Sequence, residues 1–143
     1  MRVKQLSVFL ENRSGRLREV TDLLGNAGIN IRALSLADTS DFGILRLIVN
    51  KPDEAYRILR DAQFTIRETD VLAVEVEDQP GGLARVLRIF ESGGVNVEYM
   101  YAFVEKATDN AIMIFRVEDP DQSAQLLQDN GVRLLNGEAV YSL

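Results

Sequence analysis

The sequence reads Glu-Asn-Arg-Ser-Gly-Arg-Leu at residues 11–17 and Glu-Asp-Gln-Pro-Gly-Gly-Leu at residues 77–83. In both places alternating apolar residues, typical of a strand, precede the segment, and apolar residues at helical spacing follow it. A glycine therefore stands just before a helix start in two similar stretches. This strand-turn-helix unit decides the fold, because the rest of the sequence repeats around it.

The chain is a duplication. Sliding the sequence along itself by 66 positions gives seven identities in one short window, and after a two-residue insertion the offset becomes 68. A period of this length exceeds the roughly 20 to 50 residues of solenoid repeats, so each copy is expected to be a small domain. We therefore expect two domains, residues 1–69 and residues 70–143. The identical pairs are Val8/Val74, Glu11/Glu77, Gly15/Gly81, Leu17/Leu83, Val20/Val86, Gly28/Gly94 and Asn30/Asn96 at the first offset, and Ile44/Ile112, Val49/Val117, Pro52/Pro120, Asp53/Asp121 and Leu59/Leu127 at the second.

Within each copy the apolar period changes from two to about 3.6 and back again, which predicts the order βαββαβ. The fold class is therefore α+β, with two ferredoxin-like modules whose helices cover one face of an antiparallel sheet. Glycines at 28 and 94 are expected to end the first helices, and prolines at 52 and 120 to begin the second. The expected strands are residues 5–10, 29–37, 42–49 and 64–68 in the first copy and 72–77, 95–104, 111–117 and 132–135 in the second.

The last strand of the first copy is expected to run almost directly into the first strand of the second, near Thr69 and Asp70. Modules tied so closely cannot tumble freely, and the open edges of their sheets would otherwise recruit other chains. We therefore expect the two modules to pack side by side. The outer edges of the sheets also offer a route to a homodimer.

Composition excludes several classes of function. The chain has no cysteine and no histidine, which removes disulfides, the usual zinc ligand sets and the Ser/His and Cys/His nucleophile systems. A net charge of -6 argues against a nucleic-acid partner, because such proteins normally carry surplus Lys and Arg. No apolar run approaches the ~20 residues of a membrane span. We expect a cytoplasmic protein with no catalytic residue, no metal and no cofactor.

The glycine turns carry the best functional signal. A turn of this kind presents backbone N–H groups and a helix N-terminus, which together favour an anion such as an amino-acid carboxylate. Capping by Asn, Asp or Ser explains part of the same pattern without a ligand. At the other end of each helix Gly-Ile-Asn-Ile at residues 28–31 matches Gly-Val-Asn-Val at residues 94–97. The asparagine amide suits a zwitterion, although an asparagine beside a helix-stopping glycine is also an ordinary turn former.

Each copy contains the same three features in the same order: a glycine turn, an amphipathic helix, and a Gly-hydrophobic-Asn-hydrophobic segment after the helix. On these residues, and on the Asp-Gln-Pro-Gly form of the turn at 78–81, the chain resembles the ACT domain family of amino-acid-sensing regulatory modules, in particular proteins made of two ACT domains. The resemblance covers Val3 to about Leu135. It implies that an amino acid binds at the interface of two ACT modules, between the glycine turn, the helix start and the second strand. The binding residues implied are Asn12, Arg13, Ser14, Gly15, Arg16, Leu17, Asn30 and Ile31 in the first copy and Asp78, Gln79, Pro80, Gly81, Gly82, Leu83, Asn96 and Val97 in the second.

The two copies offer a ligand different chemistry. Arg13 and Arg16 suit a carboxylate, whereas Asp78 suits an ammonium group, so one site is expected to be degenerate or differently selective. The second strand of the second copy carries Tyr99 and Tyr101, with Phe103 beyond them on the same face. These aromatics either line a pocket or pack in the core. The apolar second strands favour a branched-chain or aromatic amino acid as the small-molecule effector.

Two other functions stay open. ACT modules that resemble this one also serve as regulatory small subunits of biosynthetic enzymes of the acetolactate synthase type, which would give this chain an enzyme partner. Acylphosphatases share the βαββαβ order and use an arginine in the first turn, but the second copy has no arginine there. Two acidic clusters suggest metal ligation or acid-base chemistry, but their alternation and turn positions fit solvent exposure. They are Glu75, Glu77 and Asp78, and Glu118, Asp119 and Asp121.

Overall fold

The computed structural model describes residues 1–38, 41–104 and 109–143. These residues form two compact units. The N-terminal unit is Lys4–Thr69, and the C-terminal unit is Asp70–Leu143 together with Met1–Val3.

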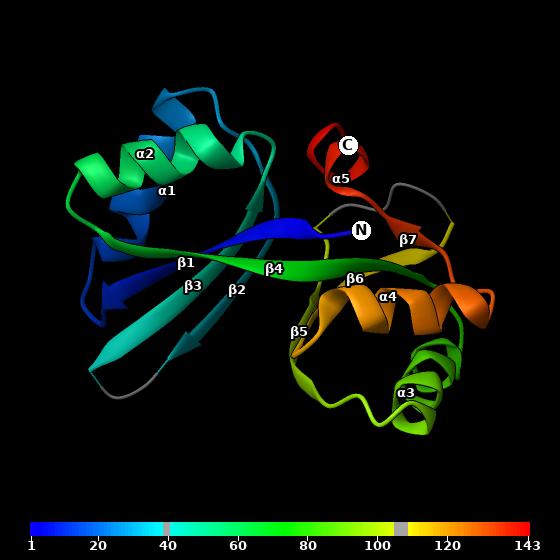
Figure 1. Ribbon diagram of the computed structural model, residues 1–143. Helices are drawn as coiled ribbons and strands as arrows, with labels where there is room; N and C mark the ends of the chain where they lie inside the picture. The colour runs from blue at the N-terminus through cyan, green and yellow to red at the C-terminus, as the bar shows by residue number, and fades with distance from the viewer. Residues whose placement is uncertain (39–40, 105–108) are drawn as a thin grey trace. The chain divides into compact units, whose positions relative to one another are not determined.

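The N-terminal unit contains two helices and an antiparallel sheet (Figure 1). The strand order is β2-β3-β1-β4, and β1 and β3 pair from Leu6 opposite Leu47 to Glu11 opposite Phe42. Both helices lie on one face of this sheet (Figure 1). The elements are β1 (Val3–Glu11), α1 (Arg16–Asn26), β2 (Ile31–Asp38), β3 (Phe42–Val49), α2 (Pro52–Asp61) and the first part of β4 (Thr65–Val76).

The C-terminal unit repeats this order. Its strands lie in the order β5-β6-β4, and the short β7 also pairs with β4, with Leu134 opposite Val74. The predicted βαββαβ order and the antiparallel α+β class are therefore confirmed in both units. The elements are the rest of β4, α3 (Gly82–Ser92), β5 (Val97–Ala102), β6 (Ala111–Val117), α4 (Pro120–Asp129) and β7 (Leu134–Leu135), followed by α5 (Gly137–Tyr141).

Each unit has its own hydrophobic core between helices and sheet. In the N-terminal unit alternate residues of β1 and β3 pack against Val20 and Leu24 of α1 and against Leu59 of α2. In the C-terminal unit Phe90 of α3 meets Phe115 of β6 edge to face, with 5.3 Å between ring centroids. The period-two pattern of the strands and the 3.6-residue pattern of the helices thus point into the same two cores.

The helices end by one repeated device, which corrects the predicted starts of the second strands. Gly28 adopts φ 72°, its N–H bonds to the carbonyl of Gly25, and the N–H of Ile29 bonds to the carbonyl of Leu24. This is a Schellman motif, so Ile29 belongs to the helix end and β2 begins at Ile31. Gly94 ends α3 in the same way, and β5 begins at Val97.

Two further expectations differ from the structure: the last strand of the second copy contains only Leu134 and Leu135, and β5 ends at Ala102. The C-terminal tail, for which no element was predicted, forms α5. The side chain of Asn136 accepts a hydrogen bond from the N–H of Ala139 and caps α5. The tail is too short for periodicity to reveal a helix.

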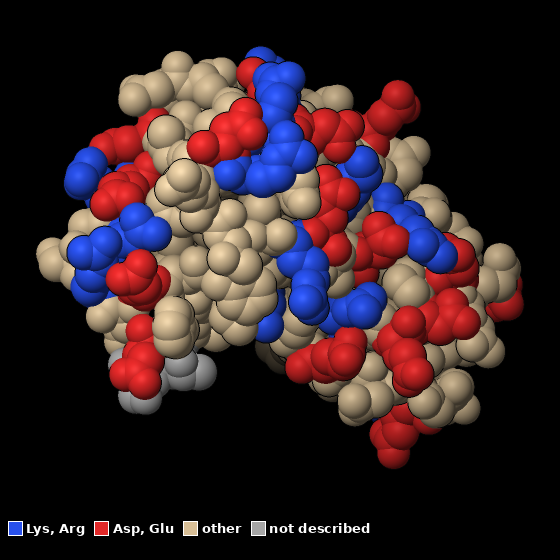
Figure 2. Space-filling model, turned by 60° about the vertical axis from the view of Figure 1, so that its left-hand side comes forward, with Lys and Arg blue, Asp and Glu red and all other residues tan. Residues whose placement is uncertain are grey.

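One face of the molecule carries a mixture of charges. On the face drawn in Figure 2, Lys and Arg side chains are interspersed with Asp and Glu over wide areas. Such a mixture differs from the basic face that nucleic acids require. Among the described residues, no helix has the length and apolar character needed to cross a bilayer.

Candidate functional site

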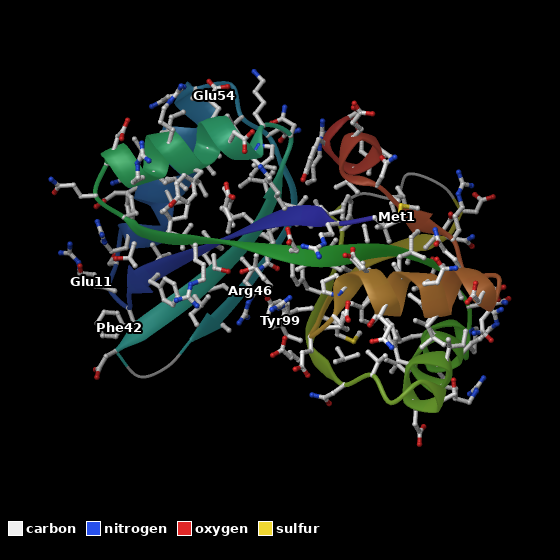
Figure 3. The ribbon with its side chains drawn as sticks, in the orientation of Figure 1. Met1, Glu11, Phe42, Arg46, Glu54 and Tyr99 are labelled. Carbon is white, nitrogen blue, oxygen red and sulfur yellow. The ribbon has the colours of Figure 1, made fainter. Side chains whose placement is uncertain are left out.

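The first predicted turn connects β1 to α1. Its geometry rests on Gly15, which adopts φ 91° and is the N-cap of α1. Glycine takes this left-handed conformation without strain and brings no side chain to the helix start. The N–H of Asn12 donates to the carbonyl of Asp41 at 2.9 Å, which fixes the turn to the start of β3. Figure 3 shows Glu11 and Phe42 at this end of the sheet, where the two residues pair.

Both arginines of this turn are engaged by carboxylates. The Arg13 Nε lies 3.2 Å from Glu11, and the Arg16 Nη1 lies 2.6 Å from Glu19. The guanidinium of Arg16 also stacks on the ring of Phe64, with 4.6 Å between its central carbon and the ring centroid. The Arg16 side chain is only 20% exposed, so it is largely fixed in place. A ligand carboxylate would compete with Glu11 and Glu19 for these cations.

The second turn connects β4 to α3 with nearly the same backbone. Gly81 adopts φ 86° and is the N-cap of α3. Gly82, the counterpart of Arg16, is buried against the end of β4, and a Cβ there would lie 2.0 Å from the carbonyl oxygen of Glu77. The Gln79 side chain donates a hydrogen bond to the Glu77 carboxylate. Asp78, Gln79 and Pro80 are exposed, so the second turn presents polar and acidic groups where the first presents cations.

The predicted binding residues that follow each first helix lie far from the glycine turn of their own unit. Asn30 and Ile31 follow the C-terminus of α1, whereas the glycine turn precedes its N-terminus. The 11 residues of α1 span roughly 16 Å at 1.5 Å per residue. The backbone of Asn30 is held by Asn50, whose side-chain oxygen accepts from the Asn30 N–H at 2.9 Å. The side chains of Asn30 and Asn96 are exposed. Ile31 and Val97 each pack against the core of their own unit.

Most of the predicted binding residues in the first glycine turn are exposed to solvent. Asn12, Arg13 and Ser14 are exposed, and Leu17 is 40% exposed at the start of α1. Its counterpart Leu83 is half-buried and packs against the core of the C-terminal unit.

The aromatic residues of β5 divide between two surroundings. Tyr99 pairs with Arg116, and Tyr101 pairs with Ile114, on the face that points away from α3 and α4. Tyr101 is only 8% exposed, whereas Tyr99 is half-buried. Met100 between them packs against the core of the C-terminal unit. The burial of Tyr101 favours packing over an open pocket at that position.

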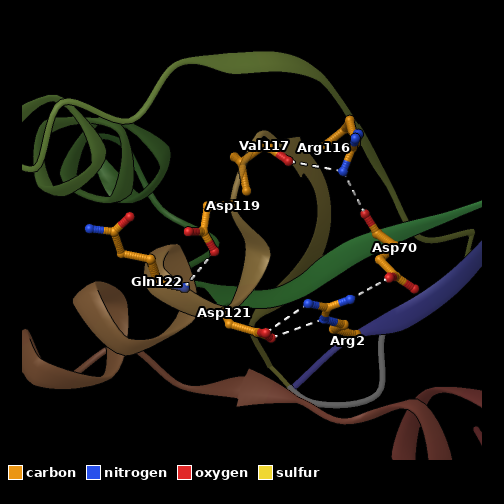
Figure 4. Close-up of polar contacts among 7 residues, drawn as sticks. All are labelled: Arg2, Asp70, Arg116, Val117, Asp119, Asp121 and Gln122. Atoms are coloured by element: carbon orange, nitrogen blue, oxygen red, sulfur yellow. Dashed lines mark hydrogen bonds and ion pairs between the residues drawn. The ribbon is translucent and has the colours of Figure 1, made fainter.

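Members of both acidic clusters make hydrogen bonds or ion pairs. Glu75 accepts from Asn110 at 3.2 Å and lies 3.5 Å from Arg133. The Asp119 side chain accepts from the Gln122 N–H and caps α4 (Figure 4). In the residues that the structure describes, no three acidic, histidine or cysteine side chains form a group that could hold a metal ion.

Asp121 belongs to an ion-pair network with Arg2. Arg2 donates to Asp121 from Nε at 3.0 Å and from Nη2 at 2.7 Å, and to Asp70 from Nη1 at 2.8 Å (Figure 4). The hydrogen bond from Arg2 lowers the pKa of the Asp121 carboxyl below its ordinary value. All three side chains are at least 41% exposed, so the network contributes little free energy but attaches the first residues of the chain to the C-terminal unit.

Sequence reasoning missed three residues that contact the two ends of the first helix. Phe64 supports Arg16 from 48 positions away, and no local pattern reveals such a contact. Asn50 holds the backbone of Asn30 from the end of β3. Glu19, three residues after Arg16 on the same helix, could have been identified from its spacing.

Comparison with known proteins places this geometry in a family. The family model described as ACT domain pair matches residues 1–143. The crystal structure of protein BT0572 from Bacteroides thetaiotaomicron is 44% identical, covers 100% of this chain and 98% of its own, and has a TM-score of 0.93. The regulatory subunit of aspartate kinase from Thermus thermophilus shares the fold at 16% identity, with 88% of this chain and 91% of that chain covered and a TM-score of 0.63.

A similar curated protein is the acetolactate synthase isozyme 3 small subunit of Escherichia coli strain K12. It is 35% identical over 94 residues, which is 65% of this chain and 48% of the relative. The acetolactate synthase small subunit of Buchnera aphidicola subsp. Baizongia pistaciae is 32% identical over 80 residues, which is 55% of this chain and 50% of the relative. The chain thus spans about half the length of the curated relatives it matches.

Proposed function

Because the chain belongs to the ACT domain pair family, we propose that it is a non-catalytic regulatory protein that binds an amino acid at the turns beginning α1 and α3. One observation carries this proposal. Both turns place a left-handed glycine at the N-cap, with φ 91° at Gly15 and 86° at Gly81. The N–H of Arg16 already donates to the carbonyl of Arg13, and that of Gly82 to Gln79, so the N–H groups that follow these two form the anion site at the positive end of the helix dipole.

The other described helices start differently, which supports a special role for these two. The side chain of Asp119 caps α4, and that of Asn136 caps α5. Pro52 begins α2 and brings no N–H at that position. At Gly15 and Gly81 the N-cap residue has no side chain that could occupy the anion position. A carboxylate from outside the chain fits there.

The two turns would not bind the same ligand equally well. The first has Arg13 and Arg16 beside it, already paired with Glu11 and Glu19, and the second has Asp78 and Gln79. A ligand carboxylate gains more from the first turn, and a ligand ammonium group gains more from the second. Branched-chain and aromatic amino acids remain our first candidates, because the second strands are apolar. The location of the ligand between two modules and the cytoplasmic location stay predictions from sequence.

A second function is a regulatory subunit that transmits amino-acid binding to an enzyme. The similarity to acetolactate synthase small subunits favours it. Affinity capture of partner enzymes with and without amino acids separates the two functions. A partner enzyme whose retention changes when the amino acid is added supports the subunit function. If no partner is retained at any amino-acid concentration, the result supports a free-standing sensor.

Thermal unfolding in the presence of each of the twenty amino acids tests the proposed binding. A ligand at ~100 times its Kd adds about 2.7 kcal/mol of stability, so at least one amino acid should raise Tm clearly. The matched variants are Gly81→Asp and Gly81→Asn, with Gly15→Asp and Gly15→Asn for the other turn. Asn and Asp both tolerate a left-handed backbone, so the members of each pair differ mainly in charge.

The Asp variants should lose the response at their own turn, because a carboxylate placed there repels the ligand carboxylate. The Asn variants should keep a weaker response. Equal responses in the Asp and Asn variants at both turns would contradict binding at the helix starts, and no response to any amino acid would contradict amino-acid sensing itself.

A further inference from the structure

The sequence contains two Asn-Gly pairs, at residues 130–131 and 136–137, and both lie in the C-terminal unit. In such a pair the backbone nitrogen of the glycine can attack the side-chain carbonyl carbon of the asparagine, because glycine has no side chain to obstruct the approach. The attack releases the side-chain amide as ammonia and leaves a succinimide ring. Both asparagines are exposed, so burial does not distinguish the two pairs. Their hydrogen bonds differ.

The Asn130–Gly131 pair is held against this reaction. It ends α4, and the N–H of Gly131 donates to the carbonyl of Gln128 at 3.0 Å. The side-chain nitrogen of Asn130, which would have to leave, donates to the carbonyl of Leu126 at 2.9 Å. The side chain of Arg85 donates to the Asn130 carbonyl at 3.2 Å. The attacking nitrogen and the leaving nitrogen are therefore both engaged in the folded chain.

The Asn136–Gly137 pair lacks these restraints. Gly137 is the first residue of α5, where N–H groups have no acceptor within the helix. Among the described residues, no acceptor binds the N–H of Gly137 or the side-chain nitrogen of Asn136. The side-chain oxygen of Asn136 accepts from the N–H of Ala139 at 2.8 Å. Negative charge develops on this oxygen during the attack, so the Ala139 N–H is placed to stabilise it.

The structure around Asn136 opposes the reaction only weakly. Ring closure requires rotation about the Cα–C bond of Asn136, whose ψ is 173°. The helix that follows, α5, has five residues, well below the roughly 12 to 15 that a helix needs to be stable by itself (Figure 1). One buried side chain, that of Val140, fixes this helix. The same rotation at Asn130 would unwind the end of α4, which has ten residues.

We propose that Asn136 is a site of spontaneous deamidation. The Gly137 nitrogen bonds to the Cγ of Asn136, and the Nδ2 of Asn136 leaves as ammonia with the proton of the Gly137 N–H. Water then opens the ring at one carbonyl to give aspartate, or at the other to give isoaspartate, in which Cβ joins the main chain. Only aspartate keeps the cap of α5 in place. The site uses no residue of either glycine turn, so it is independent of the proposed amino-acid binding.

Mass spectrometry of the full chain during storage at mildly alkaline pH tests the site. Trypsin cleaves after Arg116 and Arg133, so the two pairs fall in separate peptides, residues 117–133 and 134–143. In the folded chain the second peptide should convert from amide to acid and contain isoaspartate. The first should convert more slowly by roughly tenfold or more, because two hydrogen bonds must break there. In urea the two rates should become similar.

Gly137→Ala is the matched variant, and its methyl group should slow the conversion at Asn136. The added Cβ would lie 3.0 Å from the ring of Tyr141, a side chain that can shift. Circular dichroism verifies that the variant is folded. Equal rates for the two peptides of the folded chain, faster conversion of the first, or an unchanged rate in Gly137→Ala would overturn the proposal. So would a folded chain whose second peptide stays unconverted while the chain in urea reacts.

Discussion

The guanidinium of Arg16 stacks on the ring of Phe64 at 4.6 Å, so the first residue of α1 is held by the residue just before β4. The contact joins the glycine turn, near the start of the N-terminal module's sequence, to a residue near the end of that sequence. Its counterpart in the second turn is Gly82, which packs against backbone instead of a ring. The two copies thus hold equivalent helix starts in place by different contacts.

A double-mutant cycle measures the Arg16–Phe64 contact. Arg16→Met and Phe64→Leu, singly and together, should show a coupling free energy of about 1 kcal/mol in urea unfolding, because the cation is largely buried on the ring. Arg18→Met, an exposed arginine two residues along, serves as the control and should not couple to Phe64→Leu. Additive effects of Arg16→Met and Phe64→Leu would mean that the stacking contributes nothing.

Gly82→Ala should destabilise the C-terminal unit by about 2 kcal/mol or more, because the new Cβ would overlap the Glu77 carbonyl at 2.0 Å and backbone cannot easily move away. Gly25→Ala is the control. It lies in α1 with nothing within 4 Å of its added Cβ, and should gain about 0.5 to 1 kcal/mol from helix propensity. Urea unfolding of both variants gives the sign of each change in the free energy of unfolding. A Gly82→Ala variant with unchanged stability would contradict the close approach of α3 to β4.

Gln63→Gly should stabilise the N-terminal unit by about 1 kcal/mol. Gln63 ends α2 with φ 70°, at the position where its counterpart Gly131 ends α4 with φ 77°. A non-glycine residue is strained in this conformation, and glycine is not. Gly131→Gln is the reciprocal variant and should lose a similar amount. Chemical denaturation of the pair is the measurement, and changes of the same sign in both would refute this explanation.

The Arg2–Asp121 pair predicts a pH dependence in the acid range. Since the folded-state pKa of Asp121 lies below its ordinary value of 3.8, the stabilisation is present above that pH and is lost as the pH falls through the folded-state value. Carboxyl NMR titration of Arg2→Gln should show the Asp121 pKa rising toward 3.8. An unchanged Asp121 pKa would mean that the pair does not form in solution.

The repeat made most of the fold predictable from sequence. Strand β3 and strand β6 were predicted at their observed bounds, and Pro52 and Pro120 begin α2 and α4 as expected, because both signals are local. The starts of β2 and β5 were predicted two residues too early. Apolar Ile29 and Val95 resemble strand residues, but the backbone bonds them to the preceding helices.

The site was less accessible to sequence reasoning. The glycine N-caps follow from the residue type and the repeat, whereas the support of Arg16 by Phe64 depends on tertiary packing. The separation of the glycine turn from Asn30 by a helix was predicted from the sequence, and the structure places the ends of that helix at Arg16 and Asn26. The binding role of all sixteen residues stays a prediction.

Amide NMR shifts on saturation with a stabilising amino acid test the central proposal most directly. If the ligand carboxylate binds the helix starts, the largest changes in ¹H–¹⁵N spectra should fall on the N–H groups of residues 17 and 18 in α1 or 83 and 84 in α3, because the N–H groups of Arg16 and Gly82 already donate within the turns. The amides of Gly131 and α4 serve as an internal reference and should stay in place. Changes centred on that reference region, with the first turns of α1 and α3 unaffected, would contradict the account.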